Sequence, residues 1–488
     1  MLNNSETLAT SAILLIAIAV LGWGFNRARP YGKVGILSWL QSVVLMAPWL
    51  LFFGLFAAGI YLNLVGVLVL LLTSTIIYIY LGNRLRKAGQ DVMLREKASE
   101  RLQEQPATQE EDSSTTTAET ETAQNTNKPP IPEEDLKTIQ GLFGIDTFFS
   151  TETIPYQDGA IFKGNLRGDP EKVYQQLSSK LETALGDKYR LFLVESPENK
   201  PVVIVLPSTN DPQTSTTGQN ILAIGLIVAT IISSLEAFSL LLGFDLFTNF
   251  ERFREPFPLV VGLAIILGAH EVGHRLIAQR YGIRLSLPFF LPSLQIGSFG
   301  AFTRIESLLP SRTVLFELAL AGPAIGGLVS LLMLVTGLIL SQPGSLFQVP
   351  TEFFQGSILV GSLAKVILGS QLQESVVDVN PLTVIGWLGL VITALNLMPA
   401  GQLDGGRIVQ AIYGRKTARR TTVATLIVLG IVAISNPSNP IPLYWGILIL
   451  FLQRSLERPS LNELTEPDDA RAALGLLALF LMLATLIP

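Results

Sequence analysis

The chain contains two histidines, His270 and His274, which lie four residues apart, and Glu271 directly follows the first. On a helix this spacing places both imidazole rings on the same face, one turn apart. Two neutral imidazoles can bind a zinc ion, and an adjacent glutamate can take a proton from water activated by that ion. The pattern H-E-x-x-H therefore predicts a hydrolytic zinc site with Glu271 as the general base.

The surroundings of this pattern favour a metal site over its alternative, a pair of core histidines or a polar patch between packed helices. The three residues lie inside an apolar run, 257–280. Placing an ionisable group inside the membrane costs free energy, so such a group is expected to serve a function. The small residues Gly268, Ala269 and Gly273 would also let another helix backbone approach closely.

A catalytic zinc site usually has a third protein ligand. Since no further histidine and no cysteine is present, we expect a carboxylate. The acids in apolar surroundings are Glu236, Asp245, Glu317 and Asp404. We favour Asp404 because it lies in PAGQLDGG, residues 399–406, where proline and glycines interrupt an apolar helix and can present one acid to a buried site. The alternative is that Asp404 only caps a helix and that Asn396 only satisfies carbonyl groups freed by the helix break.

The composition predicts a polytopic membrane protein, because 49% of the residues are hydrophobic and only 15% are charged. Soluble domains are about a quarter charged, and a membrane-spanning helix needs about 20 mostly apolar residues. The absence of cysteine excludes disulfides and thiolate chemistry. The predicted spans are 8–25, 36–60, 62–82, 219–246, 257–280, 313–341, 380–400, 420–436, 438–453 and 470–487, with a weaker one within 354–371.

The composition also divides the chain into four parts. Residues 1–97 are expected to hold the N-terminal membrane helices, about three in number. Residues 98–134 are acidic, rich in threonine and poor in large apolar side chains, so they are predicted to be a disordered linker. Residues 135–208 contain strand-like and helix-like segments and are predicted to form a small soluble α/β unit. One of its helices is expected to begin at Asp169 and Pro170. Residues 209–488 form the membrane-embedded part.

Residues 283–305 interrupt the second group of spans with proline and glycine. Because irregular backbone is not tolerated in contact with lipid, this piece is expected to be a re-entrant strand or hairpin packed against protein. The predicted fold is therefore mainly α: a polytopic membrane helical bundle with a re-entrant β element, plus a small soluble α/β domain. Clusters of lysine and arginine place that soluble domain on the cytoplasmic-type side of the membrane.

Four motifs occur in a fixed order between residues 219 and 453: HEVGH, GSFGAF, LALAGP and NLMPAGQLDGG. This order resembles the site-2 protease family of intramembrane zinc metalloproteases. The resemblance implies one zinc ion per chain, bound by His270, His274 and Asp404. It implies that Asn396 helps to hold the substrate or the oxyanion, and that Gly300 lies in a substrate-handling strand.

The resemblance also implies the activity and the partners. The expected reaction is hydrolysis of peptide bonds in or near transmembrane segments of membrane-protein substrates, as in regulated intramembrane proteolysis. The expected partners are those substrates and the lipid bilayer, and no nucleic acid. Three rival interpretations remain open at this point: another membrane metalloprotease class with Glu317 as a ligand, a non-enzymatic scaffold with a vestigial zinc site, and a metal transporter.

A narrower resemblance lies upstream, in the motif GNLR at 164–167. This motif, ahead of a protease core, is similar to the EGY-like branch (ethylene-dependent gravitropism-deficient and yellow-green) of chloroplasts and cyanobacteria. A simple turn between strands is the alternative explanation of the motif. The N-terminus lacks the amphipathic pattern, rich in arginine and serine, that is typical of a transit peptide. A cyanobacterial plasma or thylakoid membrane is therefore expected, with a plastid membrane as the alternative.

Overall fold

The computed structural model describes residues 21–57 apart from 23, scattered positions between 66 and 85, and residues 131–487 apart from 157, 197, 199, 438 and 454. The chain divides into two compact units, Met1–Gln124 with Ile431–Pro440, and Asn125–Gly430 with Ile441–Pro488. In the first unit, η1 (Arg29–Tyr31) precedes the apolar helix α2 (Gly32–Ala57). The prediction for 8–25, much of that for 62–82 and the linker prediction up to residue 130 lie outside the described residues.

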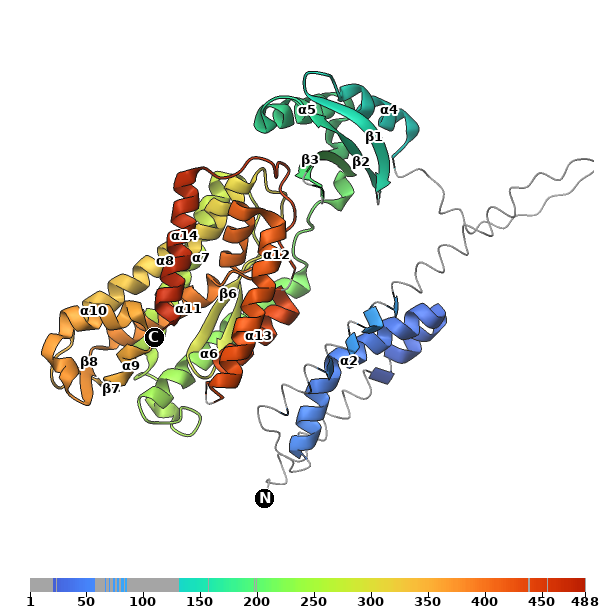
Figure 1. The fold of residues 1–488 in the computed structure, drawn as a ribbon. Helices are drawn as coiled ribbons and strands as arrows, with labels where there is room; N and C mark the ends of the chain where they lie inside the picture. The colour runs from blue at the N-terminus through green and yellow to red at the C-terminus, as the bar shows by residue number, and fades with distance from the viewer. Residues whose placement is uncertain are drawn as a thin grey trace, which may run out of the picture. The chain divides into compact units, whose positions relative to one another are not determined.

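The second unit begins with a small α/β structure, which we name the middle unit (residues 131–207). Its elements are α4 (Glu133–Leu142), β1 (Phe148–Tyr156), β2 (Gly159–Leu166), α5 (Pro170–Leu185), β3 (Tyr189–Glu195) and β4 (Pro201–Pro207). The strands form an antiparallel sheet in the order β1-β2-β4-β3. The helices cover one face of this sheet around Phe148, Phe162 and Leu177 (Figure 1). The predicted helix start is confirmed, because Asp169 accepts from two backbone N–H groups of the first turn.

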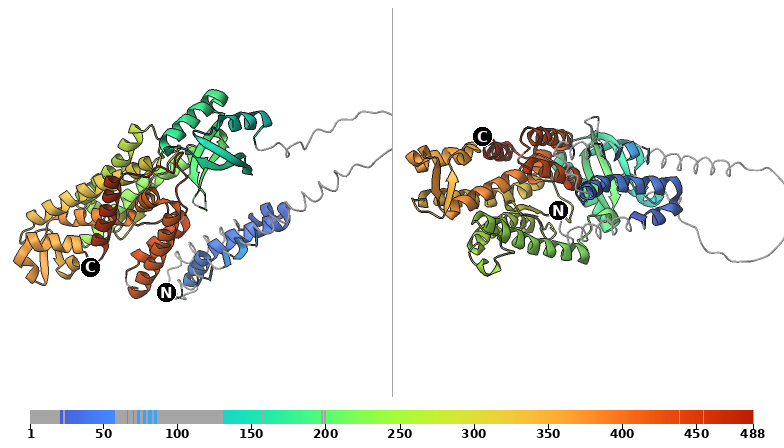
Figure 2. Two further views of the ribbon diagram at one scale, coloured as in Figure 1. Left: turned by 45° about the horizontal axis from the view of Figure 1, so that its top comes forward. Right: turned by 90° about the horizontal axis from the view of Figure 1, so that it is seen from below.

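The rest of the second unit is mainly helical. Its helices are α6 (Thr217–Leu241), α7 (Phe257–Arg280), α8 (Arg312–Leu340), α9 (Glu352–Gln355), α10 (Ile358–Leu368), α11 (Pro381–Asn396), α12 (Asp404–Ser435, which belongs to this unit up to Gly430), α13 (Ile441–Leu448) and α14 (Asp469–Leu486). Among the described residues, five helices are long and apolar enough to cross a membrane: α6, α7, α8, α12 and α14. Figure 2 shows α14, drawn in dark red, beside α10 and α11.

Helix α12 begins earlier than the predicted span at 420–436. It starts at Asp404 and is interrupted at Gly414, whose φ of 76° lies in the left-handed region that favours glycine. The helix therefore consists of a short segment, 404–413, followed by a longer apolar one. The sequence prediction missed the short segment because it follows directly on the irregular PAGQ turn and is not apolar throughout.

The segment between α7 and α8 forms a hairpin of β5 (Phe289–Ser293) and β6 (Gly297–Phe302), as predicted for 283–305. Ser233 on α6 donates to the Gly297 carbonyl at 2.8 Å, and Asn396 on α11 donates to the Phe299 carbonyl at 3.4 Å. The hairpin thus packs against helices on two sides. A second, unpredicted pair of short strands, β7 (Phe347–Pro350) and β8 (Val376–Val379), flanks α9 and α10.

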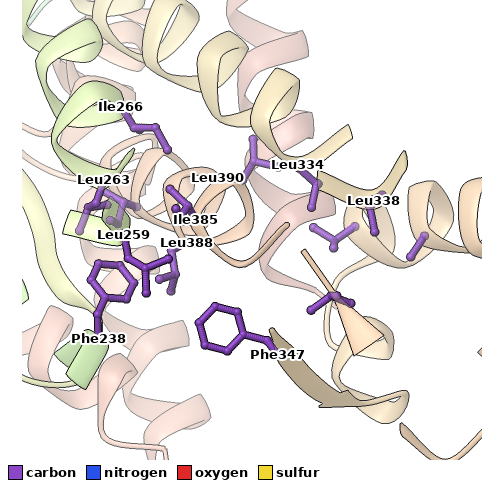
Figure 3. Close-up of a cluster of buried hydrophobic side chains, with 14 of the residues drawn as sticks. Phe238, Leu259, Leu263, Ile266, Leu334, Leu338, Phe347, Ile385, Leu388 and Leu390 are labelled. Carbon is purple, nitrogen blue, oxygen red and sulfur yellow. The ribbon is translucent and has the colours of Figure 1, made fainter. Parts of the chain in front are cut away.

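Helices α7, α8 and α11 share one apolar core, which includes Leu263, Ile266, Leu334 and Ile385 (Figure 3). The approach of α8 and α11 is close enough to require glycine: a Cβ on Gly386 would lie 2.3 Å from the backbone nitrogen of Leu334. Small residues at a helix contact let the backbones approach in this way. This packing fixes the helix that carries both histidines.

Candidate metal centre

The three predicted ligands meet at one point. His270 and His274 come from α7, and Asp404 is the first residue of α12. Oδ2 of Asp404 lies 3.2 Å from Nε2 of His270 and 3.5 Å from Nε2 of His274, and the two Nε2 atoms are 3.2 Å apart. His274 and Asp404 are buried, and the three side chains form a group able to hold a metal ion.

These separations fit zinc. Ligand atoms about 2.0–2.1 Å from a tetrahedral ion lie about 3.4 Å from one another. Nδ1 of His274 lies 2.8 Å from the Leu318 carbonyl, which can only accept, so Nδ1 carries the proton and Nε2 keeps its lone pair for a metal. Two imidazoles and one carboxylate leave a fourth position for water or substrate, as in catalytic zinc sites.

Glycines allow α7 and α8 to approach closely at this site. A Cβ on Gly273 would lie 2.4 Å from the carbonyl oxygen of Ala321, and a Cβ on Gly326 would lie 2.8 Å from Cβ of His270. The prediction that Gly273 admits a neighbouring backbone is confirmed. The same prediction for Gly268 was wrong, because a Cβ there would meet nothing within 4 Å.

Glu271 is buried, and its two carboxylate oxygens have different surroundings. Oε2 accepts a hydrogen bond of 2.8 Å from Oγ1 of Thr303. Oε1 lies 2.9 Å from Nη2 of Arg275 but outside hydrogen-bonding geometry, and among the described residues it has no hydrogen-bond partner. One oxygen is therefore held by the Thr303 hydroxyl, and the other faces the Arg275 guanidinium as an ion pair without a hydrogen bond. Sequence reasoning missed Thr303, although it directly follows the GSFGAF motif.

Asn396 and Gly300 also lie together. Nδ2 of Asn396 donates to the Ile392 carbonyl at 2.9 Å, and a Cβ on Gly300 would lie only 2.5 Å from this nitrogen. Gly300 has a φ of 98°, so glycine is required there on both counts. A cavity of about 30 Å³, lined by His274, Asp404, Asn396 and neighbouring residues, is large enough for a water molecule.

The other acids that were considered as third ligands are engaged elsewhere. Glu317 accepts from Tyr281 at 2.7 Å and from Nε of Arg471 at 3.0 Å. Glu236 accepts from the backbone of Leu246 at 3.1 Å, and Asp245 accepts from the backbone of Thr248 at 3.0 Å. The geometry therefore gives no support to the rival interpretation that places Glu317 at the metal.

Comparison with protein families finds two matches. Residues 137–213 match the model described as EGY3 middle domain, and residues 258–435 match the model described as Peptidase family M50. The first match coincides closely with the middle unit. The second contains all three residues of the candidate metal centre.

Relatives with similar sequences occur in plants. "Probable zinc metalloprotease EGY2, chloroplastic" from Arabidopsis thaliana is 39% identical over 73% of this chain and 65% of the relative. "Probable zinc metalloprotease EGY1, chloroplastic" from the same plant is 36% identical over 72% of this chain and 71% of the relative. The chain thus spans slightly less than two thirds of that EGY2 relative.

"Probable zinc metalloprotease EGY3, chloroplastic" from Oryza sativa subsp. japonica is 35% identical over 72% of this chain and 64% of the relative. No solved structure matches the chain. The family assignment therefore depends on sequence. The relatives named EGY1, EGY2 and EGY3 and the M50 match all support the same assignment. The resemblance inferred from the four motifs is confirmed: the chain belongs to peptidase family M50, within the branch of EGY-type zinc metalloproteases.

Proposed function

We propose that the chain is a zinc-dependent intramembrane endopeptidase. Its reaction is the hydrolysis of peptide bonds in or near transmembrane segments of membrane-protein substrates, as in regulated intramembrane proteolysis. The observation that carries the proposal is the convergence of His270, His274 and Asp404, which come from two apolar helices, together with the buried carboxylate of Glu271, the residue that follows His270 in the chain.

In this proposal each residue has a defined task. His270, His274 and Asp404 hold the zinc ion, which when bound polarises a peptide carbonyl and acidifies water. The carboxylate of Glu271 takes the proton of the attacking water and returns it to the leaving amine. Thr303 holds the other carboxylate oxygen, and the Leu318 carbonyl holds the ring of His274 in the tautomer that leaves Nε2 free.

The β5–β6 hairpin is, in this proposal, the re-entrant element of a polytopic helical bundle. A peptide bond in a helix is shielded by its own hydrogen bonds, so a substrate helix must unwind before it is cut. Pairing of the unwound segment with β6 would satisfy its backbone groups inside the bilayer. Gly300 permits the close approach of Asn396 to this strand, and the Asn396 amide then helps to hold the substrate or the oxyanion.

We propose that the chain has four parts: an N-terminal membrane part in 1–97, an acidic linker that was predicted to end at 134, a soluble domain predicted for 135–208 and the protease domain in 209–488. The predicted boundary at 134 was slightly late, because α4 of the soluble domain begins at Glu133. The soluble domain is a candidate filter for substrates, since we see no PDZ-like insertion between the catalytic motifs. Deletion of this domain without a change in cleavage selectivity would count against that role. For location, a cyanobacterial plasma or thylakoid membrane is proposed, with the chloroplastic relatives supporting a plastid membrane as the alternative.

The decisive experiment is a cleavage assay in detergent on a panel of single-span substrates. It compares the native protein with Glu271→Gln and measures the zinc content of both. We expect zinc in both proteins and cleavage by the native protein alone. Zinc in both without cleavage of any substrate would favour a scaffold, and absence of zinc from both would overturn the metal centre.

A further inference from the structure

A segment between α13 and α14, residues 456–463, which we name the strap, connects the middle unit to the metal centre. On one side it pairs with the outer edge of β3: the Leu193 N–H donates to the Leu461 carbonyl at 2.8 Å, and the Glu463 N–H donates to the Leu193 carbonyl at 2.9 Å. Nδ2 of Asn462 also donates to Glu171 on α5 at 3.0 Å. The strap thus extends the sheet of the middle unit.

The other side of the strap forms hydrogen bonds with residues at both ends of the short helical segment that begins at Asp404. The Leu456 carbonyl accepts from Gln402 at 3.4 Å, just before this segment. The Glu457 carbonyl accepts from Gln410 at 3.2 Å and from Arg415 at 2.5 Å, at its far end. Both ends of the segment that presents Asp404 are therefore held by two consecutive strap residues.

One buried ion pair links the strap to the ligand itself. Arg407 and Glu457 are both less than 10% exposed, and Nη2 and Nε of Arg407 lie 2.9 and 3.0 Å from Oε2 of Glu457. Nη1 of Arg407 lies 3.8 Å from Oδ1 of Asp404, the oxygen that faces away from the imidazoles. The carboxylate of Asp404 thus has its histidine-facing oxygen at the metal position and its other oxygen beside a cation.

The same guanidinium reaches the general base through one intermediate residue. Nη2 of Arg407 donates to the Thr303 carbonyl at 3.1 Å, and Oγ1 of Thr303 holds Glu271. Arg407 therefore contacts the third ligand and the strand end that orients the base. A buried cation without a partner would be drawn towards Asp404 and would compete with a metal for that carboxylate. Glu457 removes this competition by neutralising Arg407.

We infer that Arg407 and Glu457 form a positioning pair that sets the affinity and geometry of the metal centre, with Glu457 supplied by the strap. This inference rests on the proposed function. Partners that orient a metal ligand typically change metal affinity about tenfold to a hundredfold when they are removed. Because the strap also pairs with β3, the pair ties the metal centre to the middle unit.

The test measures zinc affinity by competition with a chelator, and the visible spectrum of the Co²⁺-substituted protein, for the full-length chain. The variants are Arg407→Gln, Glu457→Gln and the double variant. Arg471→Gln is the matched control, because it breaks the Arg471–Glu317 ion pair between α14 and α8. Each test variant is expected to weaken zinc binding about tenfold to a hundredfold and to shift the Co²⁺ bands, which report ligand geometry.

The double variant distinguishes positioning from general damage. Once Arg407 is gone, Glu457 has no cation to neutralise, so the double variant should bind zinc no more weakly than Arg407→Gln. Additive losses, or zinc affinity and Co²⁺ spectra like those of the native protein in both single variants, would overturn the inference. If Arg407→Gln fails to fold, the zinc affinity and Co²⁺ spectrum of Glu457→Gln still test the inference, because this change keeps the side-chain volume. Failure of the native protein to bind zinc would instead overturn the proposed function.

Discussion

Gly322 on α8 faces His274 on α7 so closely that a Cβ on the glycine would lie 2.2 Å from Nε2, the nitrogen directed at the metal position. The backbone of α8 therefore forms one wall of the metal centre. This glycine belongs to LALAGP, the third of the four motifs that were noted in the sequence. Glycine is needed at this position of the motif because any side chain would occupy the space of the His274 imidazole.

Replacement of Gly322 by alanine is expected to remove zinc from the protein. The new methyl group would occupy the coordination side of His274, whose ring cannot easily move away because it is fixed by its hydrogen bond to Leu318. Zinc content of the purified protein measures the effect. Gly268→Ala is the control, since a Cβ there meets nothing within 4 Å. Full zinc occupancy in Gly322→Ala would contradict the geometry of the α7–α8 contact.

The identity of the third ligand is tested by a pair of isosteric changes. Asp404→Asn removes the anionic donor next to the two imidazoles, so we expect zinc binding and cleavage to be lost together. Glu317→Gln changes an acid that is engaged with Tyr281 and Arg471, so zinc binding should persist. Loss of zinc in Glu317→Gln with retention in Asp404→Asn would instead support the rival metalloprotease class.

The hydroxyl of Thr303 is expected to matter for turnover and not for zinc content. Thr303→Val keeps the shape of the side chain but removes the donor to Oε2 of Glu271. General base catalysis typically raises the rate about a hundredfold or more. A Glu271 carboxylate that is no longer held in place should lose part of this effect, so kcat should fall about tenfold. Thr393→Val is the control, because its hydroxyl donates only within α11, to the Gly389 carbonyl. An unchanged kcat in Thr303→Val would show that Glu271 needs no such support.

The sequence could predict the parts of this structure that depend on local pattern. The apolar runs predicted α6, α7, α8, α11 and α14, and helical spacing placed His270 and His274 on one face. The choice of Asp404 came from the helix break before it. Thr303, Arg407 and Glu457 could not be found in this way, because their contacts join residues that are 32, 104 and 50 positions apart in the chain. No local periodicity encodes such pairs.

The short strands β7 and β8 were missed for a related reason. Each is four residues long, and Phe347–Pro350 pairs with Val376–Val379 although α9 and α10 lie between them in the chain. Runs of this length do not distinguish a strand from a helix end or a loop. The β5–β6 hairpin was predicted because a glycine- and proline-rich stretch inside a membrane part has few other acceptable structures.

The GNLR motif allows a prediction about the middle unit. Gly164 pairs with Ser150 beside an irregularity in β1, and a Cβ on it would lie 2.1 Å from the carbonyl oxygen of Phe149. The motif is thus the end of β2, which leads to α5, and not a turn between strands. Gly164→Ala must push β1 away, and such overpacking costs about 1–3 kcal/mol.

Amide hydrogen exchange of the full-length protein can measure this loss, as reduced protection of peptides from residues 148–166. Gly141→Ala in α4 is the control, since nothing lies within 4 Å of a Cβ there and alanine favours a helix more than glycine. If the middle unit filters substrates, the loosened Gly164→Ala protein should also cleave the substrate panel less selectively while keeping its zinc. Native-like protection in Gly164→Ala would mean that β1 can shift at little cost, and that the glycine of GNLR is not needed for close strand pairing.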